Sequence, residues 1–155
     1  MRFMWIDYAE EYEDIVESWL DEKAVRLTGM DEGFQDYFQC MINDSDTKYG
    51  ENFWVKVIFE REKPIGIMAV GLWEEAFIIS EIIISPPHRG NGIGSAAISE
   101  WVDFSNSIIG VSCVKAKAVI FPNNIASQKA FEKAGFKFVS AHPDGDAWYY
   151  EYNAV

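Results

Sequence analysis

The stretch from residue 82 to residue 94 constrains the fold of this chain more than any other. An almost wholly apolar run, typical of a strand, meets Pro86 and Pro87, which cannot donate hydrogen bonds to a sheet and therefore end the strand. A glycine-rich turn follows, Arg89-Gly90-Asn91-Gly92-Ile93-Gly94, and a helical pattern of apolar residues begins at once. The chain is therefore expected to contain a strand and a helix joined by a tight turn.

This glycine-rich turn has the properties of an anion-binding site. The first turn of a helix leaves backbone N–H groups without partners, and the helix dipole adds partial positive charge there. Gly90, Gly92 and Gly94 carry no side chain that would keep a phosphate away, and Arg89 adds a cation. The turn is therefore predicted to bind a pyrophosphate. The alternative is a tight turn that uses glycine for its geometry alone.

Two other phosphate-binding loops do not fit. The chain has no GxxxxGK[ST] pattern, which excludes a P-loop. The glycines are spaced GxGxG rather than GxGxxG, and no acidic residue follows the next strand at about 20 residues, as a dinucleotide-binding fingerprint requires.

The remaining elements follow from hydrophobic periodicity. One face of a first helix is expected to comprise Tyr12, Ile15, Val16, Trp19 and Leu20. Strands are predicted at residues 2–6, 53–60, 65–72, 76–85, 111–120, 136–139 and 148–152. Further helices are predicted at about 33–42, at 93–110 and at 125–134, with a loop over 43–51.

Length and composition point to one domain, residues 1–155, in a reducing cytoplasm. The 155 residues carry a net charge of −12, which argues against broad nucleic-acid binding because phosphate contacts need clustered cations. No apolar run is long enough to cross a bilayer. Two cysteines, Cys40 and Cys113, make neither a disulfide framework nor a metal cluster, and two distant histidines support no metal site.

A second motif follows the next predicted strand, Asn124-Ile125-Ala126-Ser127-Gln128-Lys129-Ala130-Phe131-Glu132-Lys133-Ala134-Gly135-Phe136. Together with Arg89-x-x-Gly92-x-Gly94, it resembles the GNAT superfamily of Gcn5-related N-acetyltransferases, whose matching segments are RxxGxG and NxxSxxxFxxxGF. Ile84-x-Pro86-x-His88-Arg89-Gly90 and Pro64-Ile65-Gly66 also fit the family pattern. The specific resemblance covers about residues 64–139.

The resemblance implies an α/β (α+β) fold, with a mixed, mostly antiparallel sheet flanked by helices on both faces. It also implies acetyl-CoA (coenzyme A) as the cofactor, lying where the strand that ends at Ile84 splays from the strand after Val111 at a bulge. The residues implied to hold it are Ile82, Ile84, Arg89, Gly90, Asn91, Gly92, Ile93, Gly94, Asn124 and Ser127. Asn124 also suits a simple helix N-cap.

The catalytic residues depart from the family pattern. The usual positions for a general base match Ile78 and Ser80, neither of which is a good base. Glu81 is one residue away and should point opposite to Ser80 unless a bulge redirects it. We therefore keep Glu81 and Ser80 as catalytic candidates; alternatively Glu81 is a rim or salt-bridged residue.

The general acid departs from the family pattern as well. Phe131 occupies a position where many family members have a tyrosine, and phenylalanine cannot donate a proton. Water is one replacement. Three residues of the last strand are others: Tyr149, Tyr150 and Tyr152.

Charge is unevenly distributed and suggests the substrate. Residues 1–62 hold 16 acidic and 6 basic residues, a balance of −10, whereas residues 63–155 have a balance of −2. Because the resemblance places much of the acceptor site in this first part, we expect a cationic acceptor, a small-molecule or peptide amine, and N-acetyltransferase activity. The alternative is a non-catalytic CoA-binding regulatory module. Trp148, Tyr150 and Tyr152, expected to be exposed on one strand face, would supply a homodimer contact.

Overall fold

The computed structural model describes residues 1–21, 52–145 and 147–154. Its strands are β1 (Met4–Asp7), β2 (Phe53–Glu60), β3 (Lys63–Trp73), β4 (Ala76–Ile84), β5 (Lys115–Ile120), β6 (Lys137–Ala141) and β7 (Trp148–Asn153). Its α-helices are α1 (Glu13–Ser18), α4 (Ile93–Ile109) and α5 (Ile125–Lys133), with short 3-10 turns η1 (Glu10–Tyr12) and η2 (Pro86–His88). The helix and loop expected at 33–42 and 43–51 lie outside the described residues.

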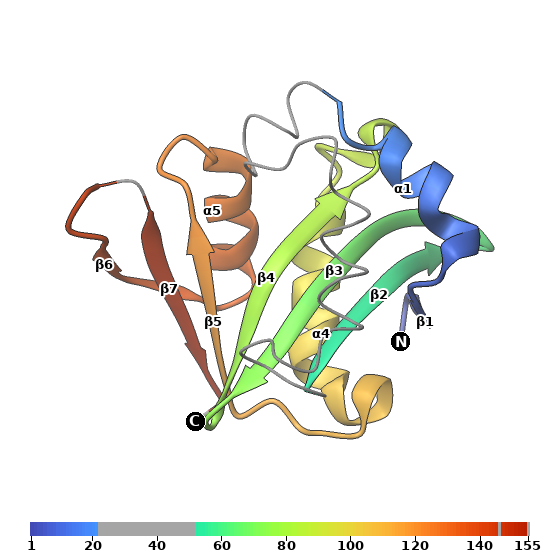
Figure 1. Ribbon diagram of the computed structural model, residues 1–155. Helices are drawn as coiled ribbons and strands as arrows, with labels where there is room; N and C mark the ends of the chain where they lie inside the picture. Colours follow the sequence, from blue (N-terminus) through green and yellow to red (C-terminus); the bar gives the residue numbers. More distant parts are fainter. Residues whose placement is uncertain (22–51, 146, 155) are drawn as a thin grey trace.

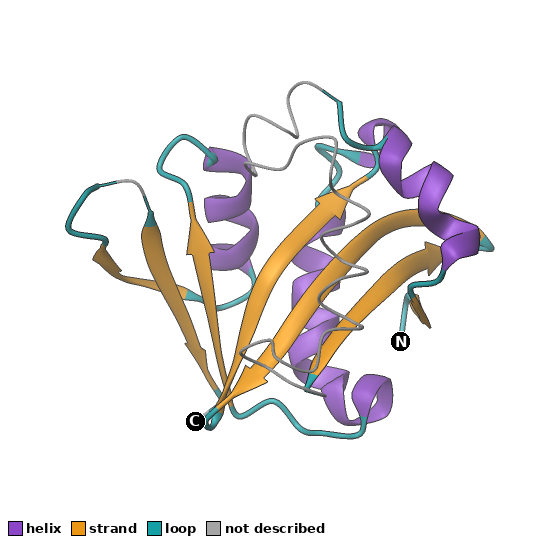
Figure 2. Ribbon diagram, viewed as in Figure 1, coloured by secondary structure: helices purple, strands orange, loops and turns teal. Residues whose placement is uncertain are grey.

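The strands form one seven-stranded sheet in the order β1-β2-β3-β4-β5-β7-β6. Every neighbouring pair is antiparallel except β4 and β5, which run parallel. Helices lie on both faces, with α1 on one and α4 and α5 on the other (Figures 1 and 2). The predicted α/β fold with a mixed, mostly antiparallel sheet is confirmed.

Two hydrophobic cores lie on opposite faces of the sheet. The larger contains Trp101 of α4, Phe131 of α5 and the inward residues of β5, such as Ala118. The smaller packs Val16 of α1 and Trp19 against residues of β2 and β3. None of the helices in the described part of the chain is long and apolar enough to cross a bilayer.

The first helix is shorter than predicted, and its apolar face is narrower. The α-helix covers only Glu13–Ser18, and Ile15 is 41% exposed. Val16 and Trp19 are buried, whereas Ile15 lies outside the arc that contacts the sheet. The boundary of the fifth predicted strand also moves, because β5 begins at Lys115 rather than at Val111.

The expected exposed aromatic face on the last strand is wrong. Tyr150 is only 2% exposed and belongs to the larger core, against which Trp148 and Tyr152 also pack. The reason is that residues of α4 and α5, among them Trp101 and Phe131, pack in one core with this face of β7. The basis for the predicted homodimer contact is therefore removed.

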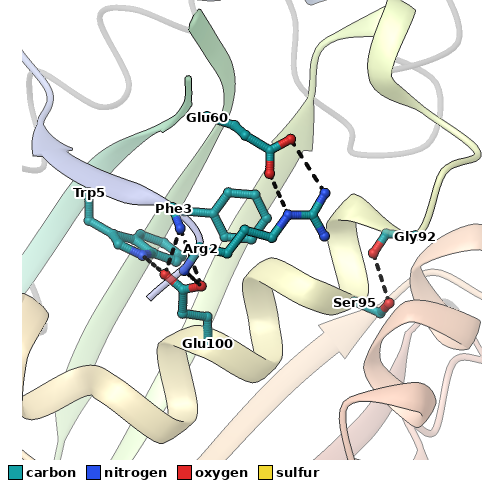
Figure 3. Close-up of polar contacts among 7 residues, drawn as sticks. All are labelled: Arg2, Phe3, Trp5, Glu60, Gly92, Ser95 and Glu100. Carbon is teal, nitrogen blue, oxygen red and sulfur yellow. Dashed lines mark hydrogen bonds and ion pairs between the residues drawn. The ribbon is translucent and has the colours of Figure 1, made fainter. Parts of the chain in front are cut away.

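A buried carboxylate ties the N-terminal strand to α4. Glu100 accepts hydrogen bonds from the backbone N–H of Arg2 at 2.8 Å, from that of Phe3 at 3.0 Å and from the indole Nε1 of Trp5 at 3.1 Å. Figure 3 shows the three donors converging on the carboxylate. Arg2 separately pairs with Glu60 at the exposed surface.

Replacing Glu100 by glutamine is expected to lower the free energy of unfolding by about 2 kcal/mol, because hydrogen bonds to charged groups are lost and a buried donor is left facing other donors. Urea unfolding of the parent and the variant measures this loss. Glu60→Gln is the matched control: it breaks an exposed ion pair and should leave the urea midpoint almost unchanged. Equal midpoints for all three proteins would contradict the role of Glu100.

Candidate active site

The splay between β4 and β5 creates the opening that defines the site. The two parallel strands are paired only from Phe77 to Ile79 and from Ala116 to Ala118. Figure 1 shows them side by side near their N-terminal ends and apart near their C-terminal ends. Beyond Ile79, the backbone groups of β4 that face the opening are not paired with β5, so they can contact a bound molecule.

A β-bulge occurs in β4 where the opening begins. Ile79 is paired with Val70 and Glu81 with Ala69, so Ser80 is the extra residue. The bulge reverses which residues face which side of the sheet: Ile79 belongs to the core under α4 and α5, whereas Ile83 belongs to the core under α1. The bulge that the resemblance implied is confirmed, and it turns Glu81 toward the α1 side.

Glu81 is a carboxyl group in an apolar environment. Its carboxyl oxygens have no hydrogen-bond or ion-pair partner within the described part of the chain. Burial raises the pKa of Glu81 to about 8, because the charged form is poorly solvated there. A carboxyl group with such a pKa in a cleft is typical of a functional residue.

A cavity of about 220 Å³ opens between the splayed strands. It brings together both predicted catalytic residues, Ser80 and Glu81, with residues from the end of β5 and the start of α5. Asn124, Ser127 and Phe131 form its α5 side. The cavity therefore places a carboxyl group in the opening between the two strands.

The glycine-rich turn begins α4 as predicted. Gly92 is the N-cap with φ 76°, a left-handed conformation that favours glycine, and Gly90 has φ 79°. A Cβ atom at either position would meet nothing within 4 Å, so the backbone is openly accessible. The N–H groups of Ile93, Gly94 and Ser95 have no acceptor among the described residues. This arrangement fits an oxyanion or phosphate.

A second cavity of about 530 Å³ extends from this turn along β4 and α5. Of the ten residues predicted to hold the cofactor, nine line it: Ile82, Ile84, Arg89, Gly90, Gly92, Ile93, Gly94, Asn124 and Ser127. Asn91 is exposed in the turn and does not line it. Ile82, Asn124 and Ser127 also line the smaller cavity, so the two cavities are neighbours.

Arg89 is held by contacts within the protein. Its Nε donates to the backbone oxygen of Ile84 at 2.9 Å, one terminal nitrogen pairs with Asp21 at 2.7 Å, and the other donates to the backbone oxygen of Trp19 at 3.0 Å. The guanidinium therefore ties the end of β4 to the segment after α1. Much of its charge is neutralised by Asp21, so the backbone N–H groups are the more direct anion ligands.

Asn124 caps α5, as its position suggested. Its side-chain oxygen accepts the backbone N–H of Ser127 at 3.2 Å. The amide nitrogen has no partner within the described residues and stays available for a ligand. The helix lies close to α4, since a Cβ at Gly94 would come within 3.7 Å of Ala130. Small residues at this contact let the two helices approach each other closely.

Three basic residues of the larger cavity were missed as binding residues by sequence reasoning: His88, Lys129 and Lys133. Lys129 and Lys133 lie one helical turn apart on α5, on the same side as Ala126 and Ala130. The i, i+4 spacing of these pairs is the signal that could have placed the lysines at the cavity.

No tyrosine lines either cavity, within the part of the chain that the structure describes. Phe131 is buried and contacts Phe136. Tyr150 lies under the core with its hydroxyl 3.4 Å from Glu132, and Tyr149 is beside His142. Within the described residues, the candidate general base Glu81 therefore lies at the opening, whereas no tyrosine that could act as the general acid lies there.

The splayed strands, the bulge and the glycine-started helix together match a known family. Residues 6–137 match the model of the acetyltransferase (GNAT) domain family. The chain belongs to the GNAT acetyltransferase family. The resemblance drawn from the two sequence motifs is thereby confirmed.

Solved structures share the fold of this GNAT protein over nearly its whole length. Aminoglycoside acetyltransferase AAC(6')-Ib in complex with coenzyme A is 18% identical, with a TM-score of 0.76, covering 98% of this chain and 95% of that one. A domain from Methanocaldococcus jannaschii is 21% identical, with a TM-score of 0.76 and 97% of each chain covered. No curated protein matches the chain significantly.

A third similar structure is spermidine N-acetyltransferase from Vibrio cholerae in complex with CoA and spermine. It is 14% identical, with a TM-score of 0.75, covering 98% of this chain and 95% of that one. At these identities the likeness is one of fold.

Proposed function

We propose that this GNAT protein transfers the acetyl group of acetyl-CoA to a primary amine carried by a cationic small molecule or a peptide. The observation that carries the proposal is the pair of neighbouring cavities between the glycine-rich turn and Glu81. They have unpaired backbone N–H groups at one end and an unpaired, half-buried carboxyl group at the other, within the described residues.

The residues of the opening fit acetyl-CoA. When bound, acetyl-CoA supplies an acetyl group activated as a thioester. The N–H groups of Ile93, Gly94 and Ser95 would bind its pyrophosphate at the positive end of α4. The free backbone edge of β4 at Ile82 and Ile84 would orient the pantetheine arm, and Asn124 would contact it from α5. Ser80, as the bulged residue, leaves this edge open.

Glu81 would accept a proton from the attacking amine. A cationic amine enters as an ammonium ion and must be neutral to attack a carbonyl carbon. Burial raises the pKa of a carboxyl and lowers that of an amine, so the two values approach each other in the opening. The proton then moves to the carboxylate oxygen of Glu81 without a large free-energy cost.

A cationic acceptor agrees with the charge of the chain and with its relatives. Residues 1–62 have a balance of −10, and an excess of negative charge attracts cations. Two of the structures with this fold are an aminoglycoside acetyltransferase and a spermidine N-acetyltransferase. Polyamines and aminoglycosides are therefore the first acceptors to test. We also propose that residues 1–155 act as a single domain and that the protein works in the cytoplasm.

Thermal unfolding with saturating acetyl-CoA tests the cofactor. A ligand at about 100 times its dissociation constant adds about 2.7 kcal/mol, so a Tm increase of about 5–10 °C is expected for a chain of this length. Acetyl transfer to an amine panel is then followed by release of free CoA thiol.

The outcomes separate the candidate functions. A Tm increase with transfer to at least one amine supports the enzyme. A Tm increase without any transfer favours the CoA-binding regulatory module. The presence of Phe131, where many family members have a tyrosine, also favours this module. If the protein is folded and its Tm does not change at millimolar acetyl-CoA, both the enzyme and the CoA-binding regulatory module are excluded.

A further inference from the structure

An apolar surface lies beside the opening on the α1 side of the sheet. It comprises Val119 and Phe121, at the end of β5, and Tyr149 of β7, which is paired with Val119. We call these three residues the apolar shelf. Val119 is 50% exposed and Phe121 is 38% exposed, and both line the cavity that contains Glu81.

Strand alternation places Val119, Tyr149 and Glu81 on one face of the sheet, and Phe121 follows directly after β5. Along β5, Ala118 and Ile120 are buried in the core under α4 and α5, so Val119 between them points the other way. Along β7, Tyr150 belongs to that same core, so Tyr149 also points the other way. The bulge in β4 turns Glu81 to this face too.

A polar contact limits the length of the shelf. Lys117 and Glu151, the next residues on this face of β5 and β7, are paired with each other and form an ion pair at 3.9 Å. Two residues along a strand span about 7 Å, so the apolar surface ends about that far from Val119. This space suits a short alkyl group or one aromatic ring.

Scattered exposed apolar side chains need no explanation, but Val119 is paired with Tyr149 across two strands, and Val119 and Phe121 line the candidate active site. We propose that the apolar shelf binds a short alkyl or aryl group next to the amine of the acceptor. The favoured acceptor is then a cationic aralkylamine or alkylamine rather than a wholly hydrophilic polyamine. This inference rests on the proposed function, since it specifies the acceptor of the same site.

The test compares the specificity constant kcat/KM for two amines, phenethylamine and ethanolamine, at fixed acetyl-CoA. In the parent, we expect kcat/KM for phenethylamine to be at least about 10-fold higher than for ethanolamine, because burial of a few carbons in an apolar site typically gives such a factor. Val119→Asn should reduce this ratio about 5-fold, because the lost apolar contact weakens the reaction of the amine that carries the aryl group. Val119→Thr keeps the β-branched shape and should reduce the ratio in the same direction, which protects the test if the asparagine variant unfolds.

Val114→Asn is the matched control. Val114 is 60% exposed and precedes β5 at the end away from the opening, so the ratio should not change. Octylamine should gain no further kcat/KM over phenethylamine, because Lys117 and Glu151 end the shelf. If the protein acetylates amines but the ratio of the two kcat/KM values is the same in the parent and in the Val119 variants, this inference is overturned and the proposed function is not. Failure to acetylate any amine would overturn the proposed function and this inference with it.

Discussion

Glu81→Gln is expected to lower the kcat of acetyl transfer by about 10³-fold while leaving the dissociation constant of acetyl-CoA within about 2-fold, because general bases typically contribute 10²–10⁴-fold and the glutamine cannot accept the proton. The side chain keeps its size, so the cavity keeps its shape. Steady-state kinetics with the best acceptor, together with calorimetric titration of acetyl-CoA, measures both quantities.

The pH dependence of the same variant gives an independent readout. The parent kcat/KM should rise about tenfold per pH unit below 8 and bend near pH 8, because burial raises the pKa of Glu81 to about 8 and only the ionised form can act as a base. Above the pKa of the amine, the ammonium form that enters the site is depleted, so the parent kcat/KM should not rise further there. In Glu81→Gln, the bend near pH 8 should disappear, because a protein without this base can use only the neutral amine, whose fraction rises about tenfold per pH unit through pH 8.

The raised pKa also predicts a gain in stability for this variant. A carboxyl group whose pKa is higher in the folded than in the unfolded protein favours folding below about pH 4.5, and this contribution is lost as the pH rises to about 8. Glu81→Gln lacks this dependence. Relative to its effect at pH 4.5, it should therefore raise the free energy of unfolding at pH 8.5 by on the order of 4 kcal/mol.

Glu151→Gln is the matched control for these experiments. Glu151 lies on the same face of the sheet but is partly exposed and paired with Lys117. The kcat and the pH profile of Glu151→Gln should therefore equal those of the parent protein. A Glu81→Gln protein with parental kcat and a parental bend near pH 8 would show that another group, or water, takes the proton.

Gly92→Asp is expected to weaken acetyl-CoA binding at least 100-fold, or about 2.7 kcal/mol. The new carboxylate would stand at the N-cap of α4, where the N–H groups of Ile93, Gly94 and Ser95 have no acceptor in the described part of the chain. A negative charge there uses these donors itself and repels the pyrophosphate. Calorimetric titration of CoA into each variant measures the effect.

Two controls separate charge and backbone strain from binding. Gly92→Asn has the same shape without the charge and should lose about 10-fold or less, since asparagine tolerates the left-handed conformation. Gly110→Asp places the same side chain at the other end of α4, where the backbone angles, φ 79° and ψ 8°, are nearly those of Gly92, φ 76° and ψ 9°. It should bind CoA as the parent does. Equal losses at Gly92 and Gly110 would mean that strain in α4, and not an anion site, explains the result.

Arg89 is unsuitable for the same test, although sequence reasoning favoured it as a phosphate-binding cation. Its guanidinium contacts Ile84, Asp21 and Trp19, so a substitution would disturb the end of β4 and the segment after α1 together. A loss of binding in an Arg89 variant could therefore not be assigned to a lost phosphate contact.

The sequence alone determined the parts of this protein that depend on neighbours along the chain. β2, the start of α4 at Ile93 and the cap at Asn124 follow from local alternation, glycine placement and capping chemistry, and the structure has each of them as predicted. The two motifs predicted the family because backbone recognition of phosphate requires a fixed order of glycines within one turn.

Only the tertiary structure decided what depends on residues far apart in the sequence. The direction of Glu81 depends on a bulge in the pairing of β4 with β3, and the burial of Tyr150 depends on the packing of α4 and α5 on that face of β7. Arg89 binds Asp21, which lies 68 residues away in the sequence, and Glu100 binds Arg2 and Phe3, which lie 98 and 97 residues away. Periodicity reports which residues share a face, but it holds no information on which element covers that face, because coverage is set by the packing of the whole chain.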